Sequence, residues 1–115
     1  MTVSHIYKIC TAAEWAAAEK AGRFTGSPVD VADGFIHFST AAQAEETARR
    51  HFAGQTRLVL VSVDAKAIAD KLTWEPSRGG DLFPHLYTPL GLDAVTAVHP
   101  LPLGDDGRHV FPEMA

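Results

Sequence analysis

The pattern of apolar and polar positions predicts four main strands and two shorter extended segments. Residues 4–10 are rich in β-branched and aromatic side chains, which favour extended backbone. Residues 34–38 alternate between two faces, and residues 58–63 form a continuous apolar run that is typical of a central strand. Residues 94–103 alternate and end among prolines, as an edge strand does. The two shorter extended segments are residues 74–75 and 83–87.

Capping residues predict two helices and a shorter third one. Thr11 and Glu14 have the spacing of a capping box, and the alanine-rich segment behind them ends at Gly22. Thr40 begins a second helix in the same way. The face of that helix expected to pack inward carries Ala44, Ala48, His51 and Phe52. Asp64 is placed to cap a short helix over residues 64–72.

Glycine and proline mark the remaining segments as loops. We expect irregular structure over residues 25–34, 76–80 and 104–107, and either a frayed tail or an edge hairpin over the last eight residues. Helices early and strands late predict an α+β class rather than a doubly wound parallel sheet. Neither GxGxxG nor GxxxxGK occurs, which argues against a Rossmann or P-loop nucleotide site.

Length and composition predict a single domain over residues 1–115. Apolar residues make up 46% and charged residues 21%, the composition of an ordinary globular chain. The net charge of −4 argues against nucleic acid as a partner, because such binding needs an excess of Lys and Arg. One cysteine, Cys10, and no signal-like or membrane-length apolar run lead us to expect a cytoplasmic protein without a membrane partner. The sequence does not indicate which oligomeric state the protein adopts.

Two of the six histidines occupy positions suited to chemistry. His37 lies in an apolar strand, where alternation puts it on the same side as Phe35 and Ser39. His85 follows Pro84, whose fixed φ stiffens the backbone around it. Each suits a ligand-binding or acid–base role, and each equally suits a packed histidine bonded to nearby backbone. The residues alone leave both interpretations open.

A carboxylate and an arginine are further candidates. Glu75 lies between Trp74 and Pro76, where desolvation would raise its pKa and suit it to acid–base work. The alternative is a glutamate that points to water at a strand end. Arg78 suits a phosphate contact from a loop, or plain solvation. No HxH, HxxxH or HExxH spacing occurs, so we predict no metal site.

Three ordered motifs resemble a known family. They are DGFIHFST at residues 33–40, WE at residues 74–75 and FPHLY at residues 83–87. In that order and spacing they are similar to the small bacterial family called domain of unknown function 952, and the resemblance extends over residues 6–103. This family is grouped with the ADP-ribosyltransferase-like superfamily. The resemblance therefore implies an ADP-ribosylation-like α+β fold, with split antiparallel β-sheets and two to three helices around an NAD-binding cleft.

A further similarity is to the RNA 2′-phosphotransferases of that superfamily. Residues 37–39, 49–51 and 58–64 follow their order of a histidine strand end, a basic helix end and an apolar strand closing in Val-Asp. Lys8, next to Tyr7, departs from the pattern, since the superfamily often has His or Arg there to hold the nicotinamide side of NAD. A lysine keeps a donor and a charge but loses the ring geometry.

The resemblance implies a small enzyme that handles NAD or ADP-ribose, with NAD as a substrate-like cofactor and no metal. Its catalytic residues would be Glu75, His37 and His85. Its ligand-binding residues would be Tyr7, Lys8, Ser39, Thr40, Trp74, Arg78 and Tyr87. The acidic net charge favours a small nucleotide-like molecule or a protein side chain over RNA.

Two alternatives remain open. Lys8, in place of the His or Arg of the superfamily, is compatible with a non-catalytic module that retains the cleft for a nucleotide-like ligand. The motifs also suit a purely structural role, in which His37 and His85 bond buried backbone groups and Trp74 fills the core.

Overall fold

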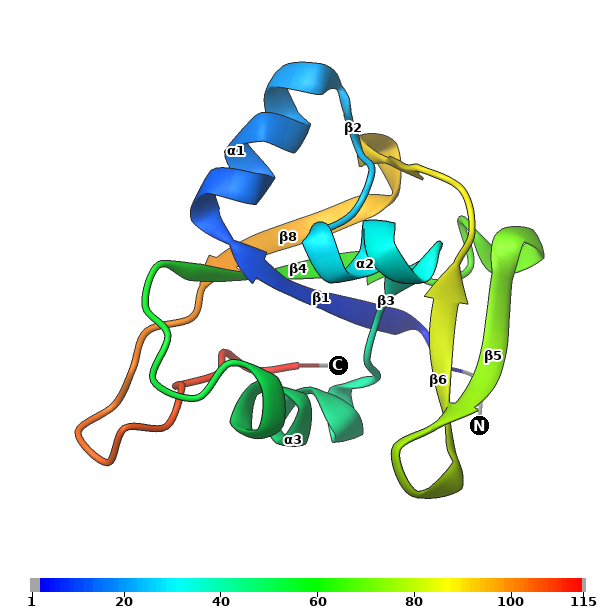
Figure 1. Ribbon diagram of the computed structural model, residues 1–115. Helices are drawn as coiled ribbons and strands as arrows, with labels where there is room; N and C mark the ends of the chain where they lie inside the picture. Colours follow the sequence, from blue (N-terminus) through cyan, green and yellow to red (C-terminus); the bar gives the residue numbers. More distant parts are fainter. Residues whose placement is uncertain (1–2, 115) are drawn as a thin grey trace.

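The computed structural model describes residues 3–114, apart from the side chain of Arg78, and its fold is α+β (Figure 1). The strands are β1 (His5–Thr11), β2 (Arg23–Phe24), β3 (Ile36–His37), β4 (Leu58–Asp64), β5 (Leu72–Ser77), β6 (Asp81–Leu86), β7 (Leu90–Gly91) and β8 (Val95–Pro100). The helices are α1 (Ala12–Ala21), α2 (Pro28–Asp33) and α3 (Ala41–His51), with short 3-10 turns η1 (Ala69–Lys71), η2 (Arg78–Gly80) and η3 (Leu92–Ala94). The strands form antiparallel sheets in the orders β1-β4-β8, β2-β7 and β3-β6-β5.

The predicted central strand is confirmed, because β4 lies between β1 and β8. Its register with β1 runs from His5 opposite Asp64 to Thr11 opposite Leu58. The predicted edge strand is also confirmed as β8. Figure 1 shows α1 on one side of this sheet and α3 on the other, which explains why the run in β4 is apolar at nearly every position.

Alternate residues of β1 enter two separate apolar clusters. Ile6 and Cys10 pack with Trp15 of α1 on one face. Tyr7 and Ile9 pack on the other face with Ala48, Leu58, Leu60 and Leu101, and the C-terminal segment covers this cluster. Each fully buried large aliphatic side chain contributes about 1.5–3 kcal/mol to folding.

The C-terminal segment makes a hairpin-like return, one of the two predicted alternatives. Leu103 and His109 form an antiparallel bridge. The amide of Val110 donates to the carbonyl of Pro102 at 2.7 Å. No helix within residues 3–114 is both long enough and apolar enough to span a membrane.

The prediction of a loop over residues 25–34 is wrong, because these residues contain helix α2. Ser27 is the N-cap, Pro28 occupies the first turn, and the amide of Ser27 donates to Oδ2 of Asp30 at 2.8 Å. Gly34 ends the helix with a φ of +88°, a conformation that glycine adopts without a steric cost. The sequence signal for this helix was the order Ser-Pro-Val-Asp at residues 27–30, but the neighbouring glycines favoured a loop.

The helix predicted over residues 64–72 is also wrong. Oδ1 of Asp64 accepts from the amide of Lys66 at 3.0 Å, which makes a local turn instead of a helix cap. Only Ala69–Lys71 is helical, as a 3-10 turn. The loop predicted over residues 76–80 is shorter than expected, because β5 continues through Ser77 and pairs it with Asp81.

Candidate functional site

The sheet β3-β6-β5 brings together the three residues that sequence analysis nominated as catalytic. His37 on β3 lies directly opposite His85 on β6, and their ring centroids are 5.5 Å apart. Glu75 on β5 is opposite Phe83, so it is the diagonal neighbour of His85 on the same face of the sheet. The motifs around these residues are separate in sequence and become neighbours through strand pairing.

His85 is held by a carboxylate on the next strand. Its Nδ1 lies 2.7 Å from Oε1 of Glu75, and the side chain of His85 is 7% exposed. The same Oε1 accepts a hydrogen bond from the hydroxyl of Tyr87 at 2.6 Å. The bonds from Tyr87 and His85 lower the pKa of Glu75, and the carboxylate in turn raises the pKa of Tyr87.

The expectation of a raised Glu75 pKa is therefore wrong. The carboxylate is partly exposed, so desolvation contributes little, and two donors stabilise its charged form. Glu75 consequently acts as an anion that orients His85 and Tyr87, and it is poorly suited to be a proton donor near neutral pH.

Asp30 of α2 is a buried acceptor that sequence analysis did not identify. Only 1% of its side chain is exposed, and its oxygens lie 2.7 and 3.0 Å from Nζ of Lys8. Its Oδ1 also lies 2.6 Å from Nδ1 of His37 and accepts from the amide of His37 at 3.2 Å. Burial alone would raise the pKa of Asp30, but the bond from His37 and the charge of Lys8 outweigh it and hold the pKa at about 2.

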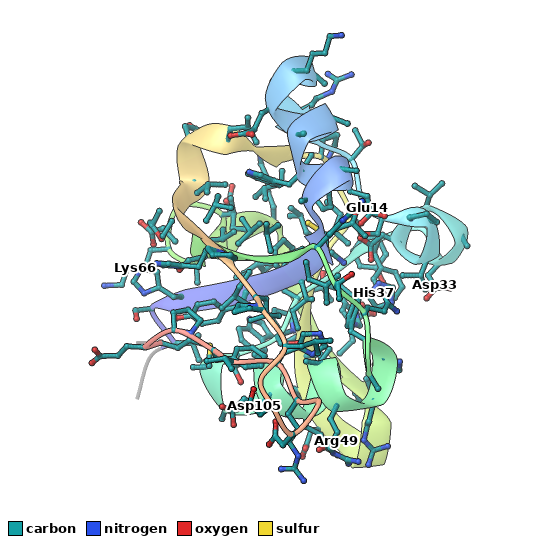
Figure 2. The ribbon with its side chains drawn as sticks, turned by 90° about the vertical axis from the view of Figure 1, so that its left-hand side faces the viewer. Glu14, Asp33, His37, Arg49, Lys66 and Asp105 are labelled. Atoms are coloured by element: carbon teal, nitrogen blue, oxygen red, sulfur yellow. The ribbon has the colours of Figure 1, made fainter. Side chains whose placement is uncertain are left out.

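The ring of His37 has a carboxylate on each nitrogen. Besides Asp30 at Nδ1, Oδ2 of Asp33 lies 3.0 Å from Nε2. Figure 2 shows Asp33 on α2 beside His37. The Phe35 ring stacks on His85 with a centroid distance of 4.2 Å and contacts the ring of His37 at 4.5 Å, so one aromatic side chain packs against both histidines.

A pocket of about 490 Å³ opens against these histidines. It lies where β1, β3, α3 and the β5–β6 hairpin meet, and its volume is that of an ordinary small-molecule site. Its lining residues are Tyr7, Lys8, Ile9, Val29, Asp33, His37, Phe38, Ser39, Thr47, His51, Phe52, Ser77, Phe83 and His85. A larger hollow of about 630 Å³ between α3 and the C-terminal segment contains none of the nominated residues.

Seven of the ten nominated residues lie at the pocket or directly behind it. Tyr7, Lys8, His37, Ser39 and His85 line the pocket. Glu75 and Tyr87 stand behind His85 and do not line it. Among the described residues, no cluster of three or more His, Cys, Asp or Glu side chains is arranged to hold a metal ion.

Two nominated residues lie elsewhere, and the side chain of a third is not described. The amide of Thr40 donates to Oε1 of Gln43 at the start of α3, where it belongs to the helix cap. Trp74 lines a different hollow, beside Lys66, and is 37% exposed. The side chain of Arg78 lies outside the described part of the chain.

The structural alternative fails in two of its details. Trp74 lies at the surface, and the core tryptophan on α1 is Trp15. The side chains of His37 and His85 pair with carboxylates and not with backbone groups. Carboxylate pairing of a histidine that lines a pocket is typical of acid–base and ligand-binding sites.

Sequence analysis missed the contributions of α2 and α3. Asp33 lies within the first family motif, yet nothing local distinguished it from a loop aspartate. Asp30 carried a signal, because its place three residues after Ser27 is that of a capping residue. His51 was interpreted as a solvated cation at the end of its helix, without a role in the site, whereas it lines the pocket together with Phe52.

Comparison with known proteins gives the family. Residues 9–98 match the family described as "Protein of unknown function (DUF952)". The chain belongs to the DUF952 family. A crystal structure of Protein CC0527 from Caulobacter crescentus is 52% identical, with a TM-score of 0.89, and the match covers 93% of this chain and 94% of that one.

A solution NMR structure of CC0527 is likewise similar to this DUF952 protein. The identity is 54% and the TM-score 0.81, with 90% of each chain covered. No curated protein matches the sequence. These relatives support the α+β fold, and their descriptions carry no substrate or activity.

Proposed function

We propose that this DUF952 protein transfers ADP-ribosyl groups from NAD, or acts on a closely related ADP-ribose nucleotide, with His85 as the general base. One observation carries the proposal: His85 lines the pocket while Glu75 holds its Nδ1 at 2.7 Å. When the neutral ring donates from Nδ1 to the carboxylate, its lone pair resides on Nε2, the form that accepts a proton.

The proposed step balances without a further cofactor. The bond between C1′ of the ribose and the nicotinamide nitrogen breaks, and its electron pair leaves with nicotinamide. A water or acceptor hydroxyl attacks C1′ and gives its proton to Nε2 of His85. Glu75 then faces an imidazolium and stabilises it, as a carboxylate behind a catalytic histidine does.

The resemblance implied that Glu75 is the carboxylate that steadies the oxocarbenium cation, and this geometry changes that role. A carboxylate that steadies an oxocarbenium cation has to face the ribose, and Glu75 is not among the residues that line the pocket. We therefore assign Glu75 as a positioning residue and His85 as the group that touches the reacting atoms. Tyr87 donates to the same carboxylate oxygen and helps to fix its position.

The nucleotide class rests on the resemblance of residues 37–39, 49–51 and 58–64 to the RNA 2′-phosphotransferases. The pocket volume is compatible with a large part of such a ligand. An NMR titration with NAD and with ADP-ribose tests binding directly. Backbone amide signals of His37, Ser39 and His85 should shift at millimolar ligand, while that of His99 on β8 should not. Unchanged signals around the pocket with both ligands would contradict the proposal.

A second candidate function, a non-catalytic nucleotide-binding module, is favoured by the state of Lys8. Its ammonium group is paired with both carboxylate oxygens of Asp30, so its charge is already balanced and it is poorly placed to replace the His or Arg of the superfamily as a ligand contact. This candidate predicts the same NMR shifts and ligand-induced thermal stabilisation, without release of nicotinamide. Nicotinamide release that His85→Asn abolishes would exclude it.

A further inference from the structure

His37 lies between two carboxylates, Asp30 and Asp33, of which we expect only Asp33 to be displaced by a ligand. Its Nδ1 is 2.6 Å from Asp30 and its Nε2 is 3.0 Å from Asp33. Because carboxylates only accept hydrogen bonds, the ring satisfies both partners as a donor when it is the doubly protonated cation.

The two carboxylates differ in how firmly they are held. Asp30 is buried and is also bonded by Lys8 and by the amide of Ser27, so it cannot leave without orphaning other groups. Asp33 is 49% exposed at the last position of α2, and its carboxylate contact is with His37 alone among the side-chain contacts described. An exposed ion pair of this kind is weak and easily exchanged.

The charge balance at the pocket wall depends on whether Asp33 stays bonded to His37. Lys8 and Asp30 neutralise each other. A cationic His37 is then balanced at the pocket wall only by Asp33, and all three of Lys8, His37 and Asp33 line the pocket. If Asp33 turned outward, this wall would present one uncompensated positive charge and a free N–H donor.

We infer that Nε2 of His37 is the binding point for a phosphate oxygen of the ligand, and that Asp33 is an internal stand-in which the phosphate displaces. This inference deepens the proposed function and rests on it for the nucleotide class. It assigns the phosphates to the α2–β3 side of the pocket and leaves the reacting ribose to His85. A charged His37 makes the same charge-assisted type of hydrogen bond to a phosphate oxygen as to Asp33, so the exchange keeps the strength of this contact.

The test uses inorganic pyrophosphate as the probe and removes the competitor. Asp33→Ala deletes the stand-in, and Asp105→Ala is the matched control, because it removes the same charge from an exposed loop that is well separated from His37 in Figure 2. The affinity for pyrophosphate is measured by calorimetry at low ionic strength. The ring ¹⁵N signals of His37 are recorded in parallel.

Asp33→Ala should tighten pyrophosphate binding by about fivefold or more, since it removes both an exposed ion pair and a repulsive charge. Asp105→Ala should change it by less than about twofold, because solvent and salt screen a distant charge. In the wild type, pyrophosphate should shift the Nε2 signal of His37. His37→Gln should abolish the binding.

Three outcomes would overturn the inference: unchanged or weaker binding in Asp33→Ala, equal tightening in Asp105→Ala, or no binding of pyrophosphate by wild type and Asp33→Ala alike. The same measurements distinguish failure of the phosphate site from failure of the proposed transfer reaction. If Asp33→Ala binds pyrophosphate more tightly while NAD is never cleaved, the phosphate site stands and the transfer reaction does not. If NAD is cleaved but Asp33→Ala alters no affinity, the reaction stands and the phosphate site does not.

Discussion

Nδ1 of His85 on β6 lies 2.7 Å from Oε1 of Glu75 on the neighbouring strand β5. The two residues are diagonal neighbours in the antiparallel register, so the pairing of the two strands sets the contact. A carboxylate beside Nδ1 favours the tautomer that carries the proton there, which in the proposed reaction leaves Nε2 as the proton acceptor. The proposed reaction depends on this pair.

The ionisation of Tyr87 reports the charge on Glu75. The hydrogen bond to the carboxylate raises the pKa of Tyr87 above its usual value of 10.0, because the phenol has to lose its proton beside a negative charge. Glu75→Gln should therefore lower the pKa of Tyr87. Spectrophotometric titration of tyrosinate in a Tyr7→Phe background isolates this group, since the chain has 2 tyrosines. Glu19→Gln, an exposed change on α1, is the control and should leave the titration curve unchanged.

Removal of Asp30 should be strongly destabilising. Asp30→Asn leaves the ammonium group of Lys8 buried without a charged partner, which should cost about 3–5 kcal/mol in the free energy of unfolding. The double variant Lys8→Met/Asp30→Asn should recover most of that loss, because no buried charge remains. Urea unfolding of both variants measures the difference. A single variant within about 1 kcal/mol of wild type would show that the pair is more hydrated than its burial indicates.

Asp30 also predicts a window of acid sensitivity. Its pKa falls from 3.8 to about 2 on folding, so its contribution is fully present above about pH 4 and is lost as the pH falls toward 2. The loss should amount to about 2 kcal/mol. Unfolding free energies measured across this window should fall more steeply in wild type than in Lys8→Met/Asp30→Asn. Parallel curves would contradict the assignment.

Cys10 should be inert in the native protein. Its side chain is 1% exposed, and burial raises the pKa of the thiol to about 12, so almost no thiolate is present near neutral pH. A thiol-specific chromogenic reagent should react slowly in buffer and rapidly in denaturant. Fast reaction under native conditions would mean that the packing between β1 and α1 opens readily.

The sequence predicted the fold best where one local signal decided the outcome. The continuous apolar run of β4 indicated a buried central strand, and the capping box of Thr11 and Glu14 indicated where α1 begins. Competing local signals caused the errors. Asp64 suits a helix cap and a tight turn equally, and Ser27–Pro28 suits a loop and a helix start equally.

The sequence singled out some residues of the candidate site but not their arrangement. His37 and His85 stood out as histidines in apolar strands, yet only the register of β3 with β6 makes them neighbours. The pairing of Lys8 with Asp30 joins residues 22 positions apart through tertiary contact, so neither periodicity nor spacing reveals it. The direction of the Glu75 pKa was misjudged because that pKa depends on Tyr87 and His85, which reach the carboxylate only in the folded sheet.

Release of nicotinamide from NAD tests the central claim most directly. The proposed role of His85 as general base predicts measurable release by wild type, a loss of about 100-fold or more in His85→Asn, and a smaller loss in Glu75→Gln. His99→Asn, on the exposed edge strand β8, should release nicotinamide at the wild-type rate. No release by wild type, or equal release by wild type and a folded His85→Asn variant, would contradict the account.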